Sequence, residues 1–394
     1  MALLQIPFGM LSDRIGRKRV ITAGLIIFAV GSVIAASSHG IWGVIIGRAI
    51  QGAGAIAAAM MALLADLTRE EVRTKATAMV GMTIGISFTI SLILGPWLDA
   101  AIGVKGIFWL TALLAVVAIV VLHTAIPDPE HNKIHRDAET IPSQLGAALR
   151  NFELLRLDIG ILVLHAIMTA MFIAMPFVLR DQLQLPVLHH SWVYLPILLV
   201  AIGLMVPMVI IAEKRRKMKP VFLVSIAFIA LSTALLSLFH SGWVGVITGL
   251  LLFFIAYNVL EATLPSLVSR IAPVDGKGTA MGIYSTSQFL GAFIGGAGGG
   301  LLLAHFGVVG IFIVSAVVAL LWLVLAVGMV PPQMRTLVIY AVNPDRVDDV
   351  DELEQCLLQM AGVSEVRIAR EEAVAYLRIE RSQFDEDGVK ALLA

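Results

Sequence analysis

The chain has 394 residues, of which 59% are hydrophobic and only 14% are charged, and its mean hydropathy is +0.92. A soluble globular protein is about 45–50% apolar, so this composition excludes that class and indicates a polytopic membrane protein. The 28 basic and 28 acidic residues cancel, so no net field favours nucleic acid as a partner. A single cysteine excludes an internal disulfide framework and a cysteine-only metal cluster.

Apolar segments follow one another along the first 330 residues. Residues 1–11 are too short to cross about 30 Å of hydrocarbon, which takes roughly 20 helical residues. Ten further segments are long enough, namely residues 19–38, 41–64, 76–98, 106–125, 158–180, 191–212, 220–239, 242–265, 279–303 and 308–330. The sequence therefore predicts ten complete membrane-spanning helices and one partial helix.

Basic residues are concentrated in every second connection between these spans. The alternate connections contain only Lys105 and Arg180, both at their edges. Eighteen Lys and Arg lie in the other set, which comprises residues 12–19, 65–75, 126–157, 213–219 and 266–278. Because Lys and Arg are enriched in cytoplasmic loops, we expect the second set, and the C-terminus, to be cytoplasmic.

The stretch from Gly9 to Arg19, GMLSDRIGRKR, places four basic residues between two apolar segments. Charge is costly inside hydrocarbon, so we predict a tight cytoplasmic loop that faces water. The pattern resembles the signature loop between the second and third helices of the major facilitator superfamily, a large family of twelve-helix secondary transporters. The matching positions are Gly9, Asp13, Arg14, Gly16, Arg17 and Lys18.

The resemblance implies an all-helical fold of two pseudo-symmetric bundles, and an internal repeat agrees with it. Lys75–Met79 (KATAM) recurs as Lys277–Met281 (KGTAM), 202 residues later. The same offset places the first-half counterparts of the spans 158–180 and 191–212 mostly before residue 1. We therefore expect the first helix and half of the second helix of the complete fold to lie outside this sequence.

The predicted membrane part has three sections. They are an N-terminal bundle at 1–125, a cytoplasmic linker at 126–157 and a C-terminal bundle at 158–330. The linker contains His131 and His135, which we interpret as solvated, and apolar spacing predicts an amphipathic surface helix over Ser143–Leu155.

After Pro331-Pro332 the composition becomes that of a small soluble domain at 334–394. The expected elements are strands at Thr336–Val342, Ser364–Ala369 and Val374–Ile379, and helices at Val347–Met360 and Glu386–Leu393. This β-α-β-β-α order resembles a ferredoxin-like domain of the kind that binds heavy metals, but Asn343-Pro344-Asp345 stands where those domains have Cys-x-x-Cys. We therefore expect no metal and no cofactor, and we expect the domain to contact cytoplasmic loops or a cytoplasmic partner.

The resemblance gives Asp13 a conformational role. In the family this acid lies against the N-terminal end of the eleventh helix, here near Lys277–Thr279, where the helix dipole favours a carboxylate. Asp66 matches a second acid of the family, which follows the fourth helix. We expect these acids to form a charge network that strengthens in one conformation and breaks in the other, together with Arg14, Arg17 and Arg73. The alternative for Asp13 is a solvated loop carboxylate.

Two positions inside predicted spans suggest proton coupling. Arg48, with Gln51 and Gly52, resembles the R-x-x-q-G motif of the family's fourth helix, whose arginine is implicated in proton coupling. A buried arginine costs at least about 2.5 kcal/mol, so it needs a partner or a wet cavity, and a structural ion pair is the alternative. In the second half, Glu261 could exchange a proton against substrate, and its alternative is a neutral acid bonded to a neighbouring helix.

Two further polar residues are candidates for the cavity wall. Asn258 shares one helix face with Glu261 and Pro265 at spacings of three and four residues. His165 lies in the span 158–180.

Gly85 and Gly95-Pro96 resemble the antiporter motif of the family's fifth helix, which ends in G-P-x-x-G-G. The match is partial, because Asp99-Ala100 replaces the closing glycines. Close helix packing is an alternative explanation of the small residues. The glycine-rich segment Gly291–Gly300 is the second-half counterpart, and we expect it to pack or bend in the same way.

Together these features predict a secondary transporter in the inner (plasma) membrane and not an enzyme. Its partners would be a small-molecule substrate, protons and the lipid bilayer. The sequence resembles the drug:proton antiporter branch, in a bacterial subgroup with an appended ferredoxin-like (YAM-type) domain, which implies efflux of small lipophilic compounds. Two alternatives are proton-coupled uptake of a small metabolite and a non-transporting membrane sensor or scaffold.

Overall fold

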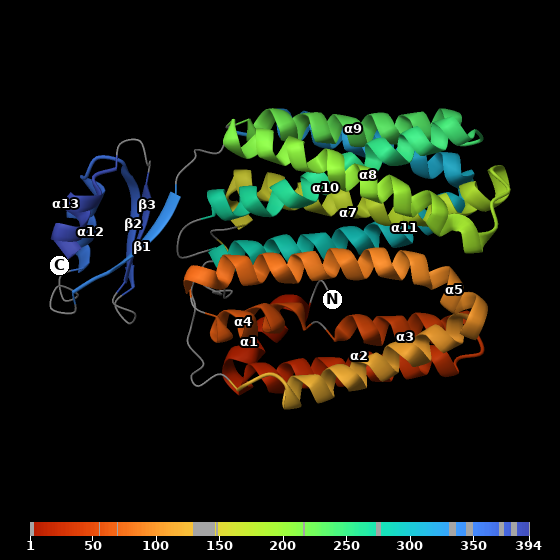
Figure 1. The fold of residues 1–394 in the computed structure, drawn as a ribbon, viewed down its shortest axis with the longest axis horizontal. Coiled ribbons are helices and arrows are strands. Elements are labelled where there is room, and N and C mark those ends of the chain that lie inside the picture. The colour runs from red at the N-terminus through yellow and green to blue at the C-terminus, as the bar shows by residue number, and fades with distance from the viewer. Residues whose placement is uncertain are drawn as a thin grey trace.

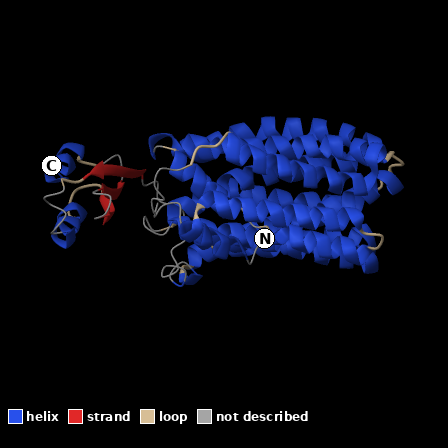
Figure 2. Cartoon of the chain, turned by 90° about the horizontal axis from the view of Figure 1, so that it is seen from below, coloured by secondary structure: helices blue, strands red, loops and turns tan. Residues whose placement is uncertain are grey.

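The computed structural model describes residues 4–54, 56–68, 70–128, 146, 149–215, 217–272, 277–330, 336–343, 350–369, 374–379 and 384–393. Long helices lie side by side along the long axis of the molecule, and a small sheet with two short helices lies beyond one end of them (Figures 1 and 2).

The first group of helices comprises α1 (Gln5–Ile15), α2 (Arg17–Ser37), α3 (Ile41–Ala53), α4 (Ala57–Leu67) and α5 (Glu70–Thr124). α5 consists of two helices joined at Gly103, whose φ of 68° is in the left-handed region that glycine tolerates best. This break falls in the connection predicted between the spans 76–98 and 106–125.

The span predicted at 41–64 is not one continuous helix. α3 ends at Ala53, Gly54 leaves the helical conformation with ψ of 59°, and α4 begins at Ala57. A Cβ atom on Gly54 would lie only 2.4 Å from the Gly24 carbonyl oxygen of α2. The chain therefore breaks where two glycine backbones meet, a contact that apolar spacing along one helix does not reveal.

The second group contains five long helices and two short turns of other helix types. Its elements are α7 (Phe152–Phe177), the π-helix η2 (Val178–Gln182), the 3₁₀-helix η3 (Val187–His189), α8 (His190–Lys214), α9 (Met218–Phe239), α10 (Trp243–Ile271) and α11 (Lys277–Val327). α11 is again two helices, joined at Gly307 with φ of 66°.

α7 begins earlier than the sequence indicated. The Asn151 side chain caps it by accepting hydrogen bonds from the backbone N–H groups of Glu153 and Leu154, at 3.1 and 3.3 Å. The amphipathic helix predicted over 143–155 is therefore wrong at its C-terminal end, because Phe152 and the residues after it belong to α7. Residues 129–145, with both linker histidines, lie outside the described part.

Eight helices in the described part are long and apolar enough to cross a membrane. Two of them contain the breaks at Gly103 and Gly307, and each of these two covers two predicted spans. A third, Ile41–Leu64, consists of α3 and α4 with the break at Gly54. The prediction that residues 1–330 form mainly apolar helices of membrane-spanning length is confirmed for the described residues.

The C-terminal part also follows the predicted order of elements. It comprises β1 (Thr336–Ala341), α12 (Val350–Leu358), β2 (Val363–Ala369), β3 (Val374–Ile379) and α13 (Glu386–Leu393). The three strands form a sheet in the order β1-β3-β2, and β3 is antiparallel to both neighbours. Leu357, Leu377 and Val389 are completely buried between the sheet and its helices.

Within the described ranges, the buried side chains form three separate clusters. The largest extends over α7 to α11 and includes Phe222, Phe253 and Phe312. A smaller one joins α2, α4 and the end of α5 around Val20 and Leu63. The third is the core of the C-terminal sheet and its helices.

Candidate functional site

The charged segment near the beginning of the chain is a sharp turn between two helices. α1 continues to Ile15 and α2 begins at Arg17, so Gly16 alone connects them, with φ of 100°. The loop predicted over 12–19 is thus shorter than expected. The side chains of Asp13 and Arg14 lie outside the described part.

Arg17 is buried, contrary to the expectation of a water-facing loop. Its side chain is 2% exposed, and Nε donates a hydrogen bond to Oδ2 of the fully buried Asp66 carboxylate at 3.0 Å. Its Nη1 donates to the Ser12 hydroxyl at 2.8 Å. A guanidinium can leave water here because a carboxylate and a hydroxyl replace its solvation. The pair joins the turn to α4, whereas the side chain of Arg73 lies outside the described part.

Lys18 is held in a similar way by the segment that follows α5. Its Nζ donates to the Ile126 carbonyl oxygen at 2.7 Å and lies 2.9 Å from Oδ1 of Asp128. The lysine is about one-tenth exposed, whereas the Asp128 carboxylate is 84% exposed. Neither Ser12 nor Asp128 was predicted, because nothing in the sequence sets them apart from other loop residues.

On α3, Arg48 and Gln51 contact each other as expected. Arg48 Nη1 donates to Gln51 Oε1 at 2.9 Å, and Gln51 Nε2 donates to the Ser32 hydroxyl of α2. Gln51 and Ser32 are buried, whereas Arg48 is exposed in the structure. The surface of α3 around Arg48 is mostly exposed within the described part.

A polar cluster lies among the apolar helices of the second group. Gln288 of α11 is at its centre, because its amide nitrogen lies 2.9 Å from His165 Nε2 and donates to Glu261 Oε1 at 3.3 Å. His165 Nε2 is 3.9 Å from Glu261 Oε2 and 3.4 Å from the Tyr257 hydroxyl. The side chain of Glu261 remains 36% exposed. Gln288 of α11 therefore links His165 of α7 to Glu261 of α10.

Three of the residues near this cluster were sequence predictions and three were not. Glu261, His165 and Asn258 were predicted, and Asn258 Nδ2 is buried without a hydrogen-bond partner among the described residues. Tyr257, Tyr284 and Gln288 were missed. A signal was present, because Tyr257 precedes Glu261, and Tyr284 precedes Gln288, by four residues, which places each pair on one helix face.

The two glycine-rich segments differ in their packing. An added Cβ at Gly85 or Gly95 would meet nothing within 4 Å among the described residues, so close packing does not explain the partial antiporter motif that ends in Gly95-Pro96. An added Cβ at Gly291 or Gly295 would lie 2.1 Å from a backbone oxygen of α7. Close packing therefore accounts for the glycines of the second half but not for those of the first, where this face of α5 is largely exposed.

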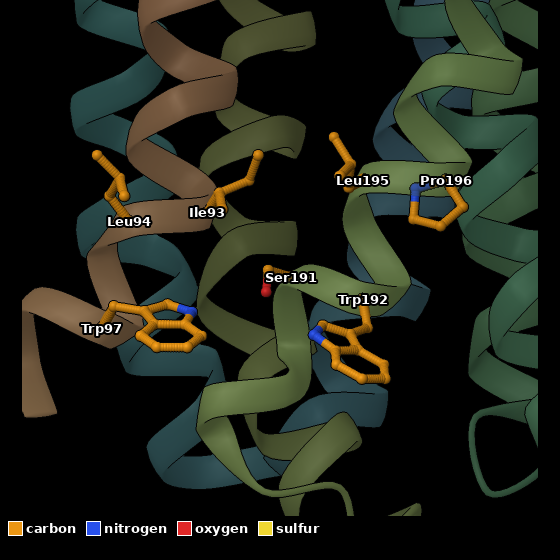
Figure 3. Close-up of a pocket in the computed structure, with 7 residues that line it drawn as sticks. All are labelled: Ile93, Leu94, Trp97, Ser191, Trp192, Leu195 and Pro196. Atoms are coloured by element: carbon orange, nitrogen blue, oxygen red, sulfur yellow. The ribbon is translucent and has the colours of Figure 1, made fainter.

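An apolar groove of about 500 Å³ lies between α5 of the first group and α8 of the second (Figure 3). Trp97 and Trp192 lie on its opposite sides, and Ser191 is the only side chain in its lining with a hydroxyl group. The remaining lining residues are Ile93, Leu94, Leu195 and Pro196. This groove was not predicted from the sequence, because its two walls are about 100 residues apart in the chain.

The described residues contain no group of three or more His, Cys, Asp or Glu side chains that could hold a metal ion. Two groups of spanning helices, a polar cluster inside the second and an apolar groove between them are the features of a polytopic membrane carrier.

Comparison with known proteins identifies the family. The family model described as Major Facilitator Superfamily matches residues 1–296 and 255–339. The inner membrane transport protein YajR of Escherichia coli (strain K12) is 44% identical over 380 residues, which is 96% of this chain and 83% of that protein. The chain therefore belongs to the major facilitator superfamily and is a multi-pass membrane transporter.

Two other comparisons agree. The uncharacterized transporter BU466 of Buchnera aphidicola subsp. Acyrthosiphon pisum (strain APS) is 35% identical over 298 residues, 74% of this chain and 75% of the relative. The crystal structure of the human organic anion transporter MFSD10 (TETRAN) superposes with a TM-score of 0.60 at 20% identity, covering 82% of this chain and 80% of that one. At that identity, the likeness to the human protein concerns the fold alone.

Proposed function

We propose that the protein is a proton-coupled exporter of small lipophilic compounds, located in the inner membrane and working by alternating access. The bacterial relative at 44% identity is called an inner membrane transport protein. The helix bundles would be residues 1–125 and 158–330, joined by the linker at 126–157. They would rock against each other around a site between them.

The observation that carries the proposal is the cluster of His165, Glu261 and Gln288 within the membrane-spanning helices. Ionisable side chains are expensive inside a bilayer and mark proton or substrate pathways. Glu261 has one buried oxygen without a hydrogen-bond partner among the described residues, yet its side chain is partly exposed. It can therefore receive a proton from one side of the membrane and release it to the other when the bundles rock.

The lipophilic nature of the substrate is supported by the groove between α5 and α8. Its walls come from the two helix groups, and its lining is almost entirely apolar. A lipophilic compound that partitions into the bilayer would find a matching surface there. The partial antiporter motif at Gly85, Gly95 and Pro96 is consistent with export, but it carries little weight because of its departures from the family pattern.

The Arg17–Asp66 pair supports the second part of the mechanism, a charge network that differs between conformations. In this proposal Asp13, Arg14, Gly16, Lys18 and Arg73 complete the network. Arg48 and Gln51 assist proton coupling from the first bundle. Residues 334–394 would form a ferredoxin-like domain in the cytoplasm that contacts cytoplasmic loops or a partner. The order β1-β3-β2 supports this, since β1 and β2 then run in the same direction on both sides of β3.

The test is transport of ethidium, a lipophilic cation, by the full chain reconstituted in vesicles with a pH-sensitive dye inside. An imposed proton gradient should drive ethidium out against the proton flow. Glu261→Gln should abolish this gradient-driven ethidium movement, and Glu261→Asp should retain part of it. The matched control is Glu213→Gln, at a carboxylate that is 52% exposed. Movement of ethidium and protons in the same direction would favour uptake by symport, and the absence of any coupled flux would contradict the proposal.

A further inference from the structure

A second acid is buried in α7, outside the cluster described above. Asp158 is 6% exposed and lies six residues after the first residue of the helix. Among the described residues no ion pair involves its carboxylate. An acid in that environment is costly unless it is neutral or has a task. Asp158 was not a predicted site residue, because it stands at the edge of a predicted span.

Asp158 and the cluster occupy successive depths in the bundle. Helices alternate in direction, so α7 and α11 begin at the end where α10 finishes. At 1.5 Å per residue, Asp158 lies about 9 Å and Tyr284 about 10 Å from that end. By the same measure, Glu261 lies about 15 Å and His165 about 20 Å from it. Polar side chains thus extend from the loop end of the bundle toward its middle.

By depth along the helices, Tyr284 lies between the two acids, and its helix α11 packs against α7. The Tyr284 hydroxyl oxygen is buried and has no hydrogen-bond partner among the described residues. A phenol can accept one hydrogen bond and donate another, so this hydroxyl has the capacity to connect the two carboxyl groups.

We propose that Asp158 is the group through which the Glu261 cluster exchanges protons with water at the loop end of the second bundle, and that the Tyr284 hydroxyl passes the proton between the two acids. The inference deepens the proposed function and rests on it. The proton route would lie within the second bundle, whereas the groove lies between α5 and α8.

The transfer conserves protons and charge. The Tyr284 oxygen accepts a proton from the Asp158 carboxyl group while its own O–H proton moves to the Glu261 carboxylate. Asp158 becomes a carboxylate, Glu261 becomes neutral, and Tyr284 is a neutral phenol before and after the step. Asp158 then takes a new proton from water at the loop end.

The proposed route consists of acids, phenols and one imidazole. Tyr284 on α11 lies nearest to Asp158 in depth, Glu261 on α10 is next, and Tyr257 and His165 lie deeper. The nearest arginine along the helix is engaged elsewhere, because Arg156 Nη1 donates to Glu153 Oε1 at 2.5 Å and to the Gly328 carbonyl oxygen at 2.7 Å. Among the described side chains, Asp158 therefore has no cation that would fix it as a permanent anion.

The test compares two activities of the full chain in vesicles. The first is ethidium movement driven by a proton gradient, and the second is exchange of ethidium across the membrane at equal pH, which needs no net proton transfer. Asp158→Asn should lower the driven rate by about tenfold or more and leave exchange within about twofold. Asp158→Glu should restore the drive with a shifted pH profile. The matched control is Asp99→Asn, at an exposed acid of α5.

Each outcome decides the matter. Equal loss of drive and exchange in Asp158→Asn would mean a structural role and would overturn the inference, as would a normal driven rate. If Asp158→Asn does not fold, Tyr284→Phe is the deciding variant, since it removes only the hydroxyl. A slower gradient-driven rate with normal ethidium exchange would support proton transfer through Tyr284. An unchanged gradient-driven rate would overturn it. A wild-type chain that exchanges ethidium without moving protons would overturn the proposed function itself.

Discussion

Arg17 and Arg19 are near neighbours in the sequence but occupy opposite environments. Arg17 is buried against Asp66 and Ser12, whereas Arg19 is exposed at the surface of α2. Sequence reasoning singled out both Arg17 and Asp66, and in the structure the two form an ion pair. The sequence did not reveal that the Arg17 guanidinium is buried, because its burial depends on α4 packing against the turn.

This difference gives a prediction for single residues. Arg17→Ala should lower the free energy of unfolding by about 3–5 kcal/mol, because the Asp66 carboxylate would remain buried without its ion pair. Arg19→Ala should change it by less than about 0.5 kcal/mol, as is usual for exposed sites. Unfolding of the purified protein in detergent, followed by tryptophan fluorescence, measures both. Similar effects of the two variants would contradict the burial of the Arg17–Asp66 pair.

The residues of the second-half cluster were partly predictable. Glu261 and His165 attract attention because ionisable residues are rare in apolar spans. Gln288 and the tyrosines do not, since a single amide or phenol in a helix is common. Only the packing of α7, α10 and α11 brings them within hydrogen-bond distance of one another, so their contribution could not be inferred from spacing along one helix.

At the scale of elements, the contact between α7 and α11 depends on glycines spaced by four residues. Gly291, Gly295 and Gly299 face Leu162, Ala166 and Ala170 of α7. In a membrane, helices associate by close packing of small residues, because lipid gives apolar side chains no reason to leave it. This contact therefore sets the distance between the helices that hold His165 and Gln288.

A matched pair of glycine variants tests this. Gly295→Ala would place a Cβ atom 2.1 Å from the Ala166 carbonyl oxygen, so the helices must separate. We expect a loss of about 1–3 kcal/mol in stability. Gly298→Ala, three residues away, meets nothing within 4 Å and should be neutral or stabilising by up to about 1 kcal/mol. Thermal unfolding in detergent distinguishes them, and equal behaviour would contradict the packing described for α11.

At the scale of the whole molecule, the C-terminal sheet has a core of its own, which shares no buried side chain with the helical part among the residues that the structure describes. Leu357→Ala removes a fully buried side chain of that core and should cost the C-terminal part about 2–5 kcal/mol. Leu358→Ala, at a side chain that is 46% exposed, should cost much less.

Limited proteolysis in increasing urea measures this effect. The C-terminal fragment of Leu357→Ala should be lost at lower urea than in the wild type, while ethidium exchange by the helical part stays unchanged. Loss of exchange at the same urea concentration would indicate that the two parts unfold as one unit.

The single cysteine offers a test of orientation. Cys356 is exposed on α12, and the positive-inside count predicts that this part of the chain is cytoplasmic. A membrane-impermeant maleimide should therefore label Cys356 in inside-out vesicles and leave it unlabelled in intact cells. Labelling in intact cells only would reverse the predicted topology, and Cys356→Ser is the control for background.

The sequence by itself determined the class of protein, the ten spans and the elements of the C-terminal part. These follow from local properties, since hydropathy over about 20 residues and the alternation of side chains along a strand do not depend on distant contacts. It also pointed to Asp66, Gln51, Glu261 and His165 through charge or polarity in unusual places.

Only the tertiary structure decided which of those residues meet. The break at Gly54, the burial of Arg17, the Gln288 bridge and the groove between α5 and α8 all depend on helices that are distant in sequence. The physical reason is that two helix surfaces together determine a glycine backbone contact or a buried ion pair. The sequence of one helix specifies only the surface of that helix.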